Sequence, residues 1–163
     1  MPELPEVEIA SRNLNRWTRG RQVSSVRTPD TARFEGDAAS LMGCRVVRWR
    51  RVGKYLVAEL DNGLSLISHL GMTGQWIADA SQERPHQRVV LVLEGAGPRT
   101  VSLVDLRRFG WTWIVGSSEV DAHPRLVNLG PDPLDDALDL ERFRSAVGHG
   151  GTALKSRLMN QRV

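Results

Sequence analysis

The chain has 163 residues, a net charge of +3 from 22 Lys+Arg against 19 Asp+Glu, 40% hydrophobic residues and one cysteine. This length suffices for one domain with a real core, or for one domain and the beginning of another. No apolar run reaches the roughly 18 residues of a membrane span, and the N-terminus lacks the features of a signal peptide, so we expect a cytoplasmic protein. Because Cys44 is the only cysteine, these residues can form neither an internal disulfide nor a zinc site built from several thiolates.

The basic residues are almost all arginine, since Lys54 and Lys155 are the only lysines. Guanidinium groups bind phosphate well and stay charged, which favours an anionic partner. For the surface as a whole, a genomic bias toward arginine is the simpler explanation. Either reading draws attention to Lys54, where an amine replaces the usual guanidinium.

The first predicted element is an amphipathic helix over residues 5–19. Its apolar side chains recur at helical spacing, Glu6 and Glu8 lie in the first turn, and Gly20 follows the end. The pattern then changes to short runs rich in β-branched and aromatic residues. The expected strands cover residues 23–28, 45–50, 54–60, 64–70, 89–94, 100–104 and 111–115.

Turn signals separate successive strands, at Asp61-Asn62-Gly63 and at Gly95-Ala96-Gly97-Pro98. They predict hairpins in an antiparallel β-sandwich or barrel. A helix followed by such a β-rich body is an α+β fold.

The last part of the chain changes character again. Residues 129–134 form a rigid Pro-containing connector, a helix is expected over 138–147, and Thr152 can cap a second helix that carries Leu154 and Leu158. Two short helices cannot bury much core alone. We therefore expect a sandwich domain over residues 1–130 and the incomplete start of a helical domain over 131–163.

The N-terminus carries a chemical signal. Removal of Met1 would leave Pro2 with a free secondary amine, whose pKa lies below that of a lysine side chain, so more of it is neutral near neutral pH. Attack by this amine on an aldehyde-level carbon gives an iminium, and Glu3 is placed to exchange protons. Taken alone, the same residues would also serve as an ordinary helix start.

A family resemblance favours the chemical interpretation. The first eight residues, Met-Pro-Glu-Leu-Pro-Glu-Val-Glu, resemble the start of bacterial formamidopyrimidine-DNA glycosylases, base-excision repair enzymes that remove oxidised purines. The resemblance spans the whole chain in order. It continues in Arg50-Arg51-Val52-Gly53-Lys54-Tyr55-Leu56, Ser68-His69-Leu70-Gly71-Met72-Thr73-Gly74, Asp105-Leu106-Arg107-Arg108-Phe109-Gly110 and Leu129-Gly130-Pro131-Asp132-Pro133-Leu134.

The resemblance implies three catalytic residues. In that family the N-terminal proline, matched by Pro2, attacks C1′ of the deoxyribose, expels the damaged base and forms a Schiff base. Glu3 matches the glutamate that assists protonation of the sugar, and Lys54 matches the lysine that donates a proton in the strand-nicking elimination. Judged from the residues alone, Lys54 is a surface lysine whose replacement should leave stability nearly unchanged.

The resemblance also implies DNA contacts. A flipped nucleotide leaves a hole in the stack, and the matching Met72, Arg107 and Phe109 form the family's intercalating triad. For a random Met or Phe, burial in the core is the commoner fate. His86 matches a DNA-contacting histidine, whereas we interpret His69 as a structural hydrogen-bonding residue at a strand end.

Several family features are missing from these residues. Gly150 stands where the family has a DNA-contacting lysine, and the rest of the helix–two-turn–helix module and the four-Cys zinc finger would lie beyond Val163. We therefore expect no metal or other cofactor in this chain.

The resulting prediction is a monomeric glycosylase/AP lyase that acts on damaged double-stranded DNA, with no membrane partner and with its second half missing. The alternatives are an endonuclease VIII-like glycosylase for oxidised pyrimidines and a non-catalytic fragment that binds damaged DNA.

Overall fold

A computed structural model describes residues 2–78, 84–134, 138–148, 151 and 153–160. The chain forms two compact units, Met1–Val120 and Asp121–Val163, and the boundary expected after residue 130 falls inside the second. Met1, Gly150 and Thr152, to which expectations were attached above, lie outside the described residues. Within the described part, no helix is both long enough and apolar enough to cross a membrane.

The first unit begins with helix α1 (Leu4–Thr18). A proline in its first turn and a reciprocal capping box between Glu3 and Glu6 start the helix. Val7 and Leu14 are buried in the core, as the periodicity predicts. Asn15 fixes the helix to the sheet, because its side chain both accepts from the backbone N–H of Trp49 (2.8 Å) and donates to its C=O (2.7 Å).

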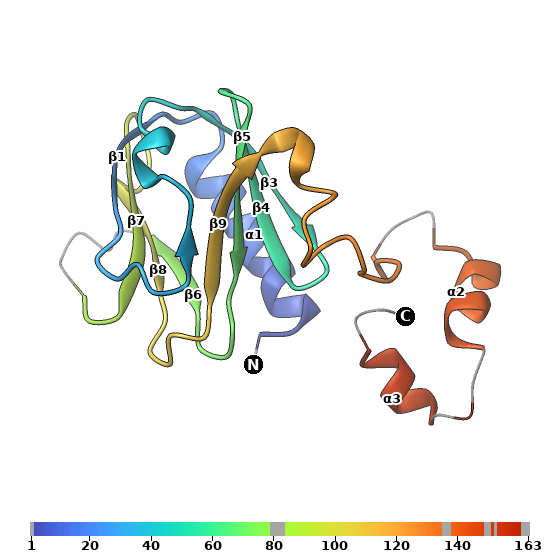
Figure 1. Ribbon diagram of the computed structural model, residues 1–163. Helices are drawn as coiled ribbons and strands as arrows, with labels where there is room; N and C mark the ends of the chain where they lie inside the picture. The colour runs from blue at the N-terminus through green and yellow to red at the C-terminus, as the bar shows by residue number, and fades with distance from the viewer. Residues whose placement is uncertain (1, 79–83, 135–137, 149–150, 152, 161–163) are drawn as a thin grey trace. The chain divides into compact units, whose positions relative to one another are not determined.

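Two sheets follow and form a sandwich (Figure 1). The four-stranded sheet has the order β1 (Val23–Arg27), β7 (Gln87–Leu93), β8 (Thr100–Val104) and β6 (Gln75–Ala78). The five-stranded sheet has the order β2 (Phe34–Glu35), β9 (Trp111–Gly116), β5 (Leu64–His69), β4 (Tyr55–Leu60) and β3 (Val46–Val52). Two short 3-10 helices, η1 (Ala38–Leu41) and η2 (Ser117–Glu119), complete the unit.

All paired strands are antiparallel except β2 and β9, so the predicted α+β sandwich is confirmed. The sequence pattern did not predict β2 and β6. The first has only two residues and the second only four, which is too short for a clear alternation of side chains.

Alternate residues of the central strands face the interior of the sandwich. Both sheets and α1 contribute fully buried side chains to this one core: Val7, Leu14, Leu56, Ala58, Leu66, Val89, Leu91, Val101 and Leu103. The core fixes the strand ends, and with them the loops at the lower edge in Figure 1.

The second unit contains α2 (Leu140–Val147) and α3 (Leu154–Leu158), which contact each other. The Asp139 carboxylate caps α2 by accepting from the backbone N–H of Arg142 at 2.8 Å. Several of their apolar side chains remain exposed: Leu140, Phe143, Leu154, Leu158 and Met159. These helices therefore build little core of their own.

Candidate functional site

A pocket of about 520 Å³ lies at the start of α1. Pro2, Glu6 and Ile9 line one side of it, and the turn from Leu70 to Trp76 lines the other. The N-terminal residues and the β5–β6 turn are far apart in the sequence, yet they share this pocket. Pro2 therefore faces a space that a ligand can enter.

Glu3 and Lys54 form an ion pair beside Pro2, with Nζ of Lys54 against Oε2 of Glu3. Lys54 follows Gly53 in the tight turn between β3 and β4, where a φ of 55° suits glycine. Only 13% of the Lys54 side chain is exposed, against 43% for Glu3. The expectation of a solvated surface lysine was therefore wrong, because the ion pair folds the amine back toward α1.

Arg51 contacts both this turn and α1. No role was predicted for it from the sequence. Its side chain is 5% exposed, Nε lies 3.0 Å from Oε2 of Glu8, and Nη1 donates to the Gly53 carbonyl at 3.1 Å. Partial burial opposes ionisation of Glu8, but hydrogen bonds from Arg12 and Arg51 outweigh it and lower the pKa of Glu8. Arg51 thus links α1 to the turn that carries Lys54.

Glu6 lines the pocket and also belongs to the helix start. Its Oε2 accepts from the backbone N–H of Glu3 at 2.9 Å. Hydrogen bonds from the backbone N–H groups of Glu3 and Glu6 hold the pKa of the Glu6 carboxyl below its ordinary value. Glu6 is therefore a charged group at the rim, and its capping role explains its position.

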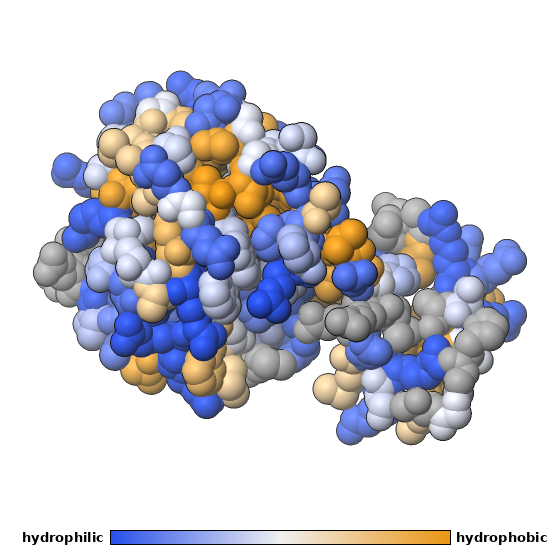
Figure 2. All heavy atoms as spheres, in the orientation of Figure 1, coloured by the Kyte–Doolittle hydropathy of each residue, from blue (hydrophilic) through white to orange (hydrophobic). Residues whose placement is uncertain are grey.

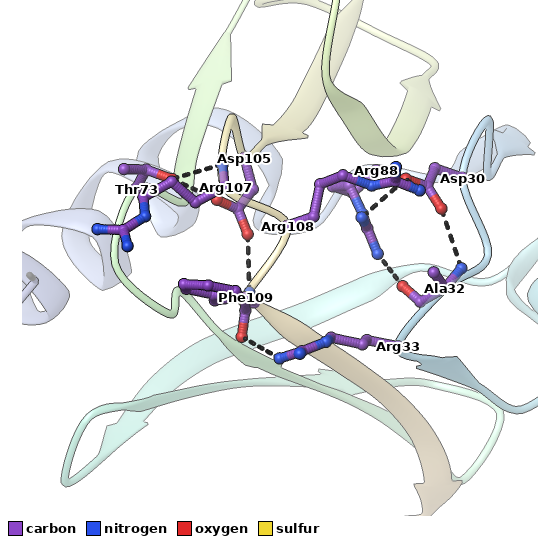
Figure 3. Close-up of polar contacts among 10 residues, drawn as sticks. Asp30, Ala32, Arg33, Thr73, Arg88, Asp105, Arg107, Arg108 and Phe109 are labelled. Atoms are coloured by element: carbon purple, nitrogen blue, oxygen red, sulfur yellow. Dashed lines mark hydrogen bonds and ion pairs between the residues drawn. The ribbon is translucent and has the colours of Figure 1, made fainter.

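The segment of residues 105–110, called the wedge loop below, is fixed from inside by Asp105 (Figure 3). Asp105 is fully buried, and its two oxygens accept from Oγ1 of Thr73 at 2.5 Å and from the backbone N–H of Gly110 at 2.7 Å. Thr73 Oγ1 also accepts from the backbone N–H of Arg107 at 3.0 Å. The β5–β6 turn and the wedge loop are therefore joined by a continuous hydrogen-bond network.

Gly71 brings the same two segments into backbone contact. It has a φ of 62°, and a Cβ at this position would lie 2.6 Å from the Gly110 nitrogen and from the Phe109 carbonyl carbon. Only glycine fits this approach without a shift of the backbone.

The structure brings the segments of Met72, Arg107 and Phe109 together at one exposed edge. Met72 is 38% and Phe109 41% exposed, and the Arg107 guanidinium lies 5.0 Å from the Phe109 ring centroid. Neither Met72 nor Phe109 is a core residue. In Figure 2, hydrophobic side chains emerge among hydrophilic ones at the lower end of the larger unit, where Figure 1 places these loops.

His86 lies in an exposed turn before β7, with a φ of 68°. Its carbonyl accepts from the backbone N–H of Asp105 at 2.9 Å, so its turn is connected to the base of the wedge loop. It also lines a second hollow of about 480 Å³, together with Asp30, Arg84 and Arg108. His69 has the structural role expected of it, because its Nδ1 accepts from the backbone N–H of Gly71 at 3.3 Å.

Comparison with known proteins agrees with this geometry. Residues 1–112 match the formamidopyrimidine-DNA glycosylase N-terminal domain. The chain is 40% identical over 168 residues to the formamidopyrimidine-DNA glycosylase of Acidiphilium cryptum and 37% identical over 163 residues to that of Thermus thermophilus. These alignments cover all of this chain and 60% and 58% of the relatives.

Solved structures show the same fold. The MutM (Fpg) protein of Thermus thermophilus superposes with a TM-score of 0.84 at 37% identity, over 99% of this chain and 58% of that one. The Fpg of Lactococcus lactis in complex with DNA that contains an abasic site gives 0.86 at 26% identity, over 99% of this chain and 61% of that one. The chain belongs to the formamidopyrimidine-DNA glycosylase family and spans about 60% of the length of these relatives.

Proposed function

We propose that the chain is the catalytic part of a DNA base-excision repair enzyme, a glycosylase and AP lyase that removes oxidised purines such as 8-oxoguanine and formamidopyrimidines. The observation that carries the proposal is the position of Pro2, which lines a pocket next to the Glu3–Lys54 ion pair and opposite the Met72 turn. A nucleophile, a proton-transfer pair and an exposed apolar wedge thus lie along one edge.

The nucleophile is the secondary amine of Pro2 after removal of Met1. Its nitrogen attacks C1′ of the nucleotide, the C1′–N bond to the base breaks, and the base leaves with the bonding electron pair and takes up a proton. The Pro2 nitrogen then loses its N–H proton, and its lone pair expels the sugar ring oxygen from C1′, which takes up a proton. The resulting iminium accepts electrons from C2′. Loss of a C2′ proton and cleavage of the C3′–O bond nick the strand, and water finally releases the product from Pro2.

Glu3 and Lys54 handle the protons of these steps. The Glu3 carboxylate lies next in sequence to the nucleophile and is the group that assists protonation of the opening sugar. Lys54 is in contact with Glu3, so its ammonium can supply a proton to a departing oxygen and be restored through the same pair. The hydrogen bond from Arg51 to the Gly53 carbonyl fixes the turn that carries Lys54.

The wedge loop and the β5–β6 turn serve DNA binding. Met72 and Phe109 are apolar side chains of suitable size to fill the hole that an extruded nucleotide leaves, and Arg107 adds a cation at the same edge. His86 supplies a further contact to the phosphate backbone. The partner is damaged double-stranded DNA bound by a monomer in the bacterial cytoplasm, at the nucleoid.

This chain leaves about 40% of the length of the relatives unmatched, and the family resemblance implies further DNA contacts and the zinc finger in that part. A four-thiolate zinc site does not fit the present residues, because Cys44 is the only cysteine and its thiol is buried and donates to the Ser40 carbonyl. We propose that this part of the protein binds no cofactor, and that its activity alone is weaker on damaged purines in duplex DNA than on an abasic site.

Borohydride trapping tests the proposal. With abasic-site DNA at low salt, we expect a covalent adduct that peptide mapping places on the N-terminal nitrogen of Pro2. The control is Lys155→Ala, which removes the exposed one of the two lysines; this variant should form the adduct as the unchanged chain does. An adduct on Lys54 or Lys155 that survives Pro2→Gly would refute the assignment, and binding without trapping would favour a non-catalytic DNA-binding fragment. Parallel assays on oxidised pyrimidines separate the endonuclease VIII-like alternative.

A further inference from the structure

Arg33 lies against the outside of the wedge loop (Figure 3). Its guanidinium carbon is 5.4 Å from the ring centroid of Phe109 and 5.7 Å from that of Trp111. Nη1 also donates to the Phe109 carbonyl at 3.3 Å. One side chain thus contacts both the ring and the backbone of the exposed wedge residue.

Asp30, three residues earlier, holds the same loop at a second point. Its Oδ2 lies 2.5 Å from Nη2 of Arg108, the residue between Arg107 and Phe109. Its Oδ1 accepts from the backbone N–H of Ala32 at 3.0 Å, which closes the turn of residues 30–33 on itself. This turn therefore contacts two successive residues of the wedge loop.

The turn is anchored in the four-stranded sheet by Arg88 of β7. Only 6% of the Arg88 side chain is exposed, Nη1 lies 2.8 Å from Oδ2 of Asp30, and Nη2 donates to the Ala32 carbonyl. On its other side the turn is tied to β9, because the Arg33 carbonyl accepts from the backbone N–H of Thr112 at 3.0 Å. A buried cation and a strand thus fix the turn independently of the loop that it touches.

Backbone conformation points to the same place. Among the described residues, the non-glycine residues with positive φ are Arg33 (65°), His86 (68°) and Arg108 (59°). Such conformations are uncommon outside glycine and persist where the surroundings hold them. Arg33 and Arg108 belong to the turn and to the loop it contacts, and His86 lines the hollow beside both Asp30 and Arg108.

We propose that the turn of residues 30–33 is a brace that presets the position of the Phe109 wedge, with Arg33 as its positioning residue. This inference rests on the proposed function, in which Phe109 enters DNA. Phe109 is 41% exposed, and its ring lies between two guanidinium groups, Arg107 at 5.0 Å and Arg33 at 5.4 Å. Within the described part of the chain, Arg33 alone of the two also holds the Phe109 backbone, by its hydrogen bond to the carbonyl. Preset geometry lowers the ordering cost of inserting the ring at a damaged site.

The test compares Arg33→Ala and Arg33→Lys with Arg16→Ala, which removes the same charge from an exposed position in the last turn of α1. Each variant is titrated at several salt concentrations with a duplex that carries a tetrahydrofuran abasic analogue opposite 2-aminopurine, and with the intact duplex. We expect Arg33→Ala to reduce the preference for the abasic duplex over the intact duplex by roughly five- to tenfold. The change in 2-aminopurine fluorescence on binding should also become smaller. Arg33→Lys should recover the salt dependence but not the preference, because an ammonium cannot both stack on the ring and reach the carbonyl.

Arg16→Ala should weaken binding to both duplexes equally. If Arg33→Lys restores the full preference for the abasic duplex, or if Arg33→Ala weakens binding to both duplexes equally, then Arg33 is only a phosphate contact and the brace is refuted. Should Arg33→Ala fail to fold, the Arg33→Lys result decides between the same outcomes.

A DNA-free measurement separates this inference from the proposed function. The chain has three phenylalanines, so 4-fluorophenylalanine labelling gives three 19F signals, and Phe109→Leu identifies one of them. Arg33→Lys should shift and broaden the Phe109 signal, whereas Arg16→Ala should leave it unchanged. An unchanged Phe109 signal in Arg33→Lys would refute the brace even if Pro2 traps DNA, and a shifted signal without trapping would refute the proposed function alone.

Discussion

The hydrogen bond between Thr73 and Asp105 should contribute to the stability of the fold as well as to the position of the wedge loop. Thr73→Val keeps the shape of the side chain and removes the hydroxyl. The fully buried Asp105 carboxylate then loses the donor at 2.5 Å, and the Arg107 N–H loses its acceptor at 3.0 Å. A hydrogen bond to a charged group contributes about 1.5–3 kcal/mol, so we expect the free energy of unfolding to fall by roughly 2–3 kcal/mol.

Urea unfolding followed by tryptophan fluorescence is the appropriate assay, because all the tryptophans lie in the first unit: Trp17, Trp49, Trp76, Trp111 and Trp113. Thr73→Ser keeps the hydroxyl and serves as the matched control. Asp105→Asn retains an acceptor for Gly110 but loses the charge, and the double variant with Thr73→Val should show a coupling of about 1–2 kcal/mol.

A Thr73→Val chain as stable as Thr73→Ser, within about 0.5 kcal/mol, would show that water or another group replaces the hydroxyl. A coupling near zero would show that Thr73 and Asp105 act separately. Either result would refute the derivation of the loop position from this contact.

Two further predictions concern charged groups of the first unit. Lys54→Ala should lower the free energy of unfolding by about 1 kcal/mol, because the Lys54 side chain is 13% exposed and paired with Glu3. The control, Lys155→Ala at an exposed position, should change this free energy by less than about 0.5 kcal/mol. Equal effects of the two substitutions in thermal or urea unfolding would contradict the burial of Lys54. Hydrogen bonds from Arg48 hold the pKa of Glu59 below its ordinary value of 4.5; burial partly opposes this shift and Arg50 supports it. The interaction of ionised Glu59 with these arginines therefore stabilises the fold above pH 4.5, and this contribution is lost as the pH falls through the lowered pKa. The free energy of unfolding, measured between neutral and acid pH, should therefore fall less steeply with decreasing pH in Glu59→Gln than in the unchanged chain. The same pH dependence in both would contradict this.

The sequence predicted the main elements because their signals are local. The apolar spacing of Val7 and Leu14 and the glutamates of the first turn define α1, and runs of β-branched and aromatic residues define the central strands. The short strands β2 and β6 were missed because two and four residues are too few to give a clear local pattern. Motifs indicated Pro2 and Phe109 directly.

The supporting residues of the site could not be predicted in the same way. Asp105 and Thr73 are 32 positions apart, and Arg33 and Phe109 are 76 apart, so only the folded chain shows that they touch. Lys54 was placed on the surface because a lysine at the start of an expected strand is usually solvated, and no sequence pattern revealed its contact with Glu3. In an Arg-rich chain, neither Arg51 nor Arg88 stands out until its burial is known.

Asn15 has a consequence for association between chains. Trp49 lies on β3, the edge strand of the five-stranded sheet, and a free edge there would offer its N–H and C=O groups to a strand of another molecule. The Asn15 side chain binds both groups of Trp49, as an adjoining strand would, and α1 covers the position. The helix that carries Pro2 at its start therefore also protects this edge against intermolecular β-pairing and aggregation.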